Sequence, residues 1–130
     1  MKPLTFTLDA GPGTLWKIHV FVHPNQKSML ANRCKNGAKG YAVAFCRQFG
    51  VDDAWGKGEE RGFAAEMHFN RRDLKHDYIV HEAVHAAVAW MKLCKLDLNT
   101  YAGDQSFAEA VEHIVSGTVY YLKDRKVKLK

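Results

Sequence analysis

The sequence has few cysteines and no long apolar run. Its three cysteines, Cys34, Cys46 and Cys94, are widely spaced, and none lies in a CxxC pair. This argues against a disulfide framework and against a cysteine-rich zinc site. No apolar run approaches the ~18 residues that a membrane-spanning helix needs, so we expect no membrane partner. The first residues lack the apolar segment of a signal peptide, and we therefore expect a cytoplasmic protein.

The composition is that of one folded domain. The chain has 130 residues, of which 47% are hydrophobic and 25% charged, so it can bury a core of its own. Its net charge of +5 is concentrated at the end, because residues 123–130 contain five Lys or Arg and one Asp. We therefore expect a single domain over residues 1–122 and a basic tail over residues 123–130. Such a tail can contact nucleic acid, although a solvated, fraying end is the simpler interpretation.

Alternating apolar and polar residues predict strands in the first half of the chain. The segments with this period of two are residues 4–8, 15–23, 41–49 and 63–69. Residues 24–35 can form a short helix, and residues 52–61 are charged and contain two glycines, which is typical of a long loop. These segments predict a small, mostly antiparallel sheet.

The second half has helical periodicity. Residues 77–96 contain neither proline nor glycine and are dense in apolar side chains, which predicts a long buried helix. A second helix is expected to about residue 123, with Asp104 or Ser106 as its N-cap. Its buried stripe comprises Phe107, Ala110, Val111, Ile114, Thr118 and Leu122. A sheet followed by two helices predicts an α+β fold.

The first of these helices contains a metal-binding pattern. His81-Glu82-Ala83-Val84-His85 places two histidines at i and i+4, on one face and about one turn apart. Both imidazoles can then reach one metal ion, while Glu82 points about 100° away and is placed to act on water as a general base. The flanking residues are uncharged, and polar groups in an apolar helix are costly unless something compensates them. A bound cation would do so.

This HExxH pattern resembles the zincin metallopeptidases. The resemblance implies Zn²⁺ held by His81, His85 and a third ligand downstream, with Glu82 as the catalytic general base that acts on a metal-activated water. It also implies an edge strand that binds an extended substrate beside the active-site helix, for which residues 63–69 are the candidate. The resemblance is close over residues 78–87 and loose over the following helix.

The third ligand is open between two glutamates and another group. Val88 and Met91 stand where the metzincins carry glycine and the third histidine, so that subgroup is excluded. A glutamate on the second helix, as in the gluzincins, leaves Glu112 and Glu109. The helical angles place Glu112 nearer to the buried stripe than Glu109, so Glu112 is the favoured ligand and Glu109 the alternative.

The sequence therefore predicts a small zinc-dependent peptidase of the gluzincin type with a protein or peptide substrate. The alternative is a non-catalytic, zinc-containing regulatory or binding module that contacts a protein or, through its basic tail, a nucleic acid.

Overall fold

The computed structural model describes residues 2–35 and 42–130. Its elements in chain order are β1 (Leu4–Asp9), β2 (Lys17–His23), α1 (Gln26–Lys35), β3 (Ala44–Gln48), α2 (Val51–Ala54), β4 (Phe63–Asn70), a 3-10 turn η1 (Arg71–Asp73), α3 (His76–Leu93) and α4 (Tyr101–Asp124). The predicted α+β fold is confirmed. The short helix α2 lies in the segment that was expected to be loop, and Tyr41, the expected start of the third strand, lies outside the described residues.

The four strands form one mixed sheet in the order β1-β2-β4-β3. The pairs β1–β2 and β3–β4 are antiparallel, as expected, whereas β2 and β4 are parallel. Parallel strands require a long crossover, and here α1, β3 and α2 lie between them in the sequence. The order makes β4 an interior strand and β3 an edge strand. The assignment of the edge strand to residues 63–69 is therefore wrong.

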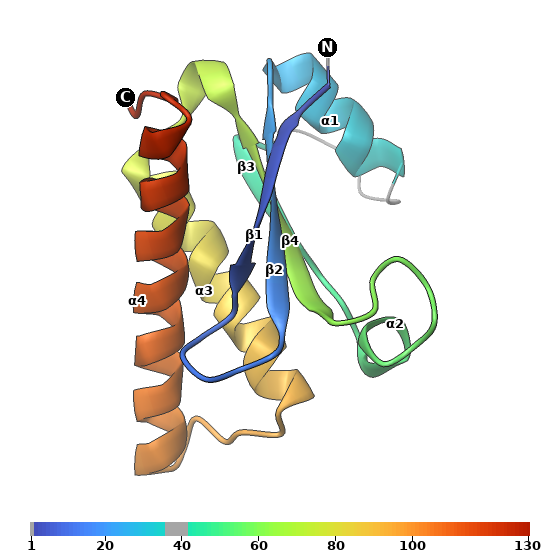
Figure 1. Ribbon diagram of the computed structural model, residues 1–130, viewed down its shortest axis with the longest axis vertical. Coiled ribbons are helices and arrows are strands. Elements are labelled where there is room, and N and C mark those ends of the chain that lie inside the picture. Colours follow the sequence, from blue (N-terminus) through green and yellow to red (C-terminus); the bar gives the residue numbers. More distant parts are fainter. Residues whose placement is uncertain (1, 36–41) are drawn as a thin grey trace.

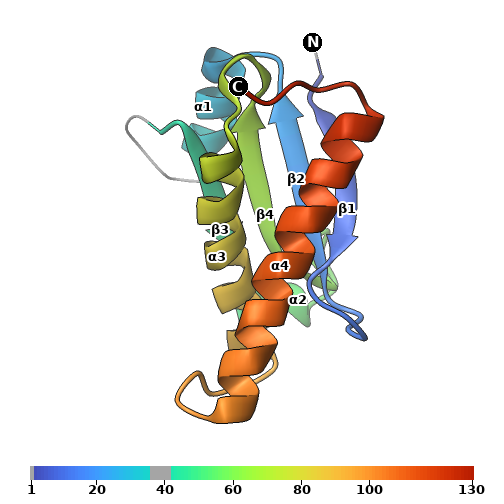
Figure 2. The ribbon, with the colours of Figure 1, turned by 90° about the vertical axis from the view of Figure 1, so that its left-hand side faces the viewer.

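The helices form layers on both sides of the sheet (Figure 1). Helices α3 and α4 lie side by side on one face, where α3 contacts β4 and β3 and α4 contacts β1 (Figure 2). Helices α1 and α2 lie on the opposite side, near the two ends of the strands (Figure 1). Helix α3 thus runs beside the edge strand, whereas α4 covers the far half of the sheet.

The main core lies between the sheet and the pair α3–α4. In the parallel register Val20 lies opposite Met67 and Val22 opposite Phe69, so the inward faces of β2 and β4 coincide. All four side chains are buried. Helix α3 meets this face with a run of buried alanines, whose small side chains permit close packing: Ala83, Ala86, Ala87 and Ala89.

Helix α4 begins before the predicted cap. Thr100 is the N-cap, and its hydroxyl oxygen accepts a hydrogen bond of 3.0 Å from the backbone N–H of Gly103. Gly103 lies inside the first turn, where any Cβ would collide with the carbonyl oxygen of Asp97. A glycine is therefore required at position 103 by a close backbone approach.

The C-terminal segment is packed rather than dangling. Helix α4 continues to Asp124, past the boundary expected after Leu122. Val127 belongs to the hydrophobic core and is 4% exposed. The backbone N–H of Lys130 donates a hydrogen bond of 2.8 Å to the backbone carbonyl of Leu74. The basic segment that was expected to be a separate tail is therefore packed as part of the domain. In the part of the chain that the structure describes, no helix is long and apolar enough to cross a membrane.

Candidate metal centre

The two motif histidines project side by side from α3. Both side chains are exposed, and the distance between His81 Nε2 and His85 Nε2 is 3.3 Å. Two nitrogens bound to one tetrahedral zinc at about 2.0–2.1 Å would be about 3.3–3.4 Å apart. The helix alone therefore sets a nitrogen spacing that fits two ligands of one tetrahedral metal ion. With the Glu82 carboxylate, the ligand atoms of this group all lie within 4.8 Å of one another, so the group can hold a metal ion.

Glu82 differs from its two neighbours in being buried. Its side chain is 5% exposed, and it lies opposite residues of β3 such as Cys46. Burial raises the pKa of the Glu82 carboxyl, and the nearby His81 opposes this effect only in part. A carboxylate whose pKa is raised is a stronger base than an exposed one, as proton abstraction from water requires.

A hollow of about 450 Å³ opens between the motif and the edge strand. His81, Glu82 and His85 form one wall, and β3 forms the other with Ala44, Phe45, Cys46 and Gln48, preceded by Ala42. The side-chain amide of Gln48 donates a hydrogen bond of 2.8 Å to the backbone carbonyl of His85. The edge strand is therefore tied to the turn of α3 that carries the candidate metal ligands.

The hollow also contains a cysteine thiol. Burial is the main cause that raises the pKa of Cys46, and the carboxylates of Glu82 and Glu66 raise it further. The thiol therefore stays protonated near neutral pH. A protonated thiol is a poor nucleophile, so Cys46 serves here as a packed side chain.

The structure does not bring Glu112 or Glu109 to the histidines. Both glutamates are exposed and line a different hollow, together with Pro12, His113 and Ser116. Among the residues described, the metal-binding group at α3 consists of His81, Glu82 and His85 alone. The expected third ligand from the second helix is thus not found in this structure.

The reason lies in the orientation of α4. Its buried stripe is Ala110, Ile114, Thr118 and Leu122. At 100° per residue, Glu112 is about 140° and Glu109 about 160° from the centre of this stripe, so both point outward. The helix also packs on β1, whereas the histidines lie beside β3 at the other edge of the sheet. Helix α4 follows α3 in the sequence, but its glutamates do not lie beside the motif histidines.

The chain matches no known family model, no curated protein and no solved structure. The assignment of its site therefore rests on the residues themselves.

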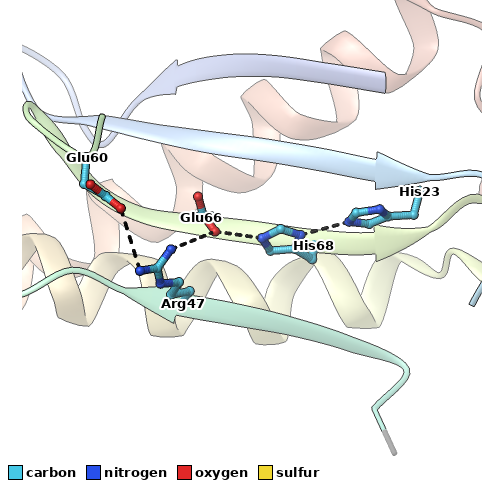
Figure 3. A network of polar contacts seen from close by, with 5 residues as sticks. All are labelled: His23, Arg47, Glu60, Glu66 and His68. Carbon is cyan, nitrogen blue, oxygen red and sulfur yellow. Dashed lines mark hydrogen bonds and ion pairs between the residues drawn. The ribbon is translucent and has the colours of Figure 1, made fainter. Parts of the chain in front are cut away.

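A second polar cluster lies on the opposite face of the sheet (Figure 3). His23 Nε2 and His68 Nδ1 are 2.9 Å apart, and His68 Nε2 is 3.0 Å from Glu66 Oε1. Arg47 lies 3.8 Å from both Glu66 and Glu60. The network therefore crosses β2, β4 and β3.

The two histidines of this network are buried, although both stand on strands at the positions opposite to the main core. His23 is 3% and His68 0% exposed. The ring of His68 is stacked between Phe21 and Phe45, with centroid distances of 4.5 and 4.3 Å. Burial alone would raise the pKa of Glu66, but the hydrogen bond from His68 and the positive charges around it lower this pKa instead. No local pattern indicates such a cluster, because the parallel pairing of β2 with β4 creates it.

Proposed function

We propose that this protein is a zinc-dependent peptidase that hydrolyses peptide bonds in the hollow between α3 and β3. The observation that carries this proposal is the 3.3 Å separation of the His81 and His85 Nε2 atoms, next to a buried carboxylate. Two histidines that served only as surface polar groups would not need a buried carboxylate between them in the sequence. The two histidines and the glutamate have the donor chemistry that zinc prefers.

The residues of the chain have distinct roles in this proposal. His81 and His85 would hold zinc, which supplies a Lewis acid that polarises the scissile carbonyl and makes water more acidic. A carboxylate oxygen of Glu82 accepts a proton from the attacking water and passes it to the leaving amine. The raised pKa of Glu82 favours the first of these transfers, because it makes the carboxylate a stronger base toward the water proton.

The edge strand offers a place for the substrate. One side of β3 pairs with β4, and its other side pairs with no strand in residues 2–35 and 42–130. Backbone groups on such an edge can pair with an extended peptide. A peptide that adds to β3 would cross the hollow directly in front of Glu82. The resemblance to zincins implies an edge strand with this role, and β3 is the edge strand that lies beside the motif.

The test is hydrolysis of a fluorogenic library of extended peptides by the wild type and by Glu82→Gln. The variant should keep its zinc, measured by elemental analysis, and lose about 10²–10⁴-fold in rate. Glu109→Gln is the control, since it makes the same chemical change at an exposed carboxylate away from the hollow. Full activity of Glu82→Gln would reject the mechanism. A zinc-loaded wild type that cleaves no peptide would favour the non-catalytic zinc-containing binding module instead.

A further inference from the structure

The net charge of the protein is confined to two segments. Residues 71–77 and 123–130 together hold eight of the 19 Lys and Arg residues and three of the 14 Asp and Glu residues. The rest of the chain has 11 residues of each sign and is neutral. The whole net charge of +5 therefore resides in two segments that lie about 50 residues apart in the sequence.

The fold joins these two segments at one end of the molecule. Helix α4 ends in a Schellman motif: Lys126 has a φ of 58°, and the N–H of Val127 donates a hydrogen bond of 2.8 Å to the carbonyl of Leu122. This turn sends the chain back over the domain, toward the connection between β4 and α3 (Figures 1 and 2). The backbone hydrogen bond from Lys130 to Leu74 then places the chain end beside Lys75.

Most charged side chains of both segments are exposed. In the C-terminal segment Val127 is buried and Leu129 half-buried, whereas the alternate residues Lys126 and Lys128 are exposed. Seven Lys and Arg side chains of the two segments are exposed. Leaving aside Lys123, which lies in the last turn of α4, we call the other six the basic surface: Arg71, Arg72, Lys75, Lys126, Lys128 and Lys130. None of the six forms an ion pair with another residue in the described part of the chain.

The acidic groups nearby neutralise little of this surface. Asp124 lies 3.6 Å from Arg125, whose guanidinium is not part of the surface because it lies over the rings of Phe6 and Tyr121. Asp73 is half-buried, and Asp77 is exposed on the first turn of α3. Six unpaired cations against these carboxylates leave a strong positive field at this end.

We propose that the basic surface binds the phosphate backbone of nucleic acid, without reading its sequence. Lys126, Lys128 and Lys130 are exposed and alternate with the inward residues Val127 and Leu129, so several cations are available to contact successive negatively charged phosphates of one backbone. A bilayer fits less well, because membrane-surface segments insert apolar side chains and here Val127 and Leu129 are turned inward. This function is independent of the proposed peptidase activity.

The experiment measures fluorescence anisotropy of a labelled DNA duplex of arbitrary sequence over a range of KCl concentrations. We expect the affinity of the wild type to fall steeply with salt, with a log–log slope of up to about −5 if all six cations contact phosphates. The variant Lys126→Gln, Lys128→Gln, Lys130→Gln should weaken binding at least about tenfold at low salt and reduce the slope by about 2.7. Arg71→Gln with Arg72→Gln should act in the same direction.

The matched control is Lys57→Gln, Lys92→Gln, Lys95→Gln, which removes the same charge from exposed positions. Lys92 and Lys95 lie at the C-terminal end of α3, whereas Lys75 is its N-cap. The control should bind DNA almost as the wild type does. Equal losses in both triple variants, or no loss in the first, would overturn the proposal. So would tighter binding to anionic phosphatidylserine vesicles or to polyglutamate than to DNA. Since all of these lysines are exposed, their variants should keep the wild-type melting temperature, which is checked first.

Discussion

Removal of one motif histidine should abolish the stabilisation of the fold by zinc without weakening the zinc-free fold. His81 and His85 are exposed, and their rings contact each other at a centroid distance of 5.0 Å. His81→Ala should therefore change the free energy of unfolding of the zinc-free protein by no more than about 0.5 kcal/mol. Zinc at 100 times its dissociation constant stabilises a single-site protein by about 2.7 kcal/mol. For a chain of this length, that is a rise in melting temperature of roughly 8–13 °C.

The assay is thermal unfolding followed by circular dichroism, with zinc and then with a chelator. The wild type should show the full rise with zinc, and His81→Ala and His85→Ala should show almost none. His76→Ala is the control, because it removes an exposed histidine from the same helix, outside the motif. Glu112→Ala should also retain the rise, since Glu112 lies in another hollow. An undiminished zinc effect in both motif variants would refute the metal site, and a lost effect in Glu112→Ala would refute the orientation of α4 described above.

Two further predictions concern the parts of the fold that differ from expectation. Val127→Ala should lower the free energy of unfolding by about 2 kcal/mol, because the side chain is 4% exposed and packs in the core. Urea unfolding measures this, and a change below about 0.5 kcal/mol would mean that the C-terminal segment frays. Burial, together with His68, lowers the pKa of His23 to about 4. The unfolded chain therefore binds more protons than the folded one between pH 6.5 and 4. Chelator-treated protein should lose up to about 3 kcal/mol of stability as the pH falls through this window. His23→Gln should flatten that dependence, and an unchanged pH profile would contradict the burial of this ring.

The sequence alone determines the features that depend on local periodicity. The i and i+4 spacing of His81 and His85 brings their rings together on any regular helix, so this pair needs no tertiary contact to form. The alternation of residues 63–69 predicts β4, and the 3.6-residue period predicts the buried stripe from Ala110 to Leu122. Each of these patterns is read within a few turns or one strand. For that reason the α+β fold and the core of the site could be predicted.

The tertiary structure decides which of these elements become neighbours. Both β3 and β4 have strand periodicity, but only the long-range pairing of β4 with β2 makes β3 the edge strand and places it opposite Glu82. The same pairing buries His23 against His68. Helix α4 packs on β1 and so carries Glu112 away from the histidines, and the turn at Lys126 folds the basic segment back onto the domain. These relations join residues tens of positions apart, and they are set by the mutual burial of apolar faces across the whole chain, which no local period encodes.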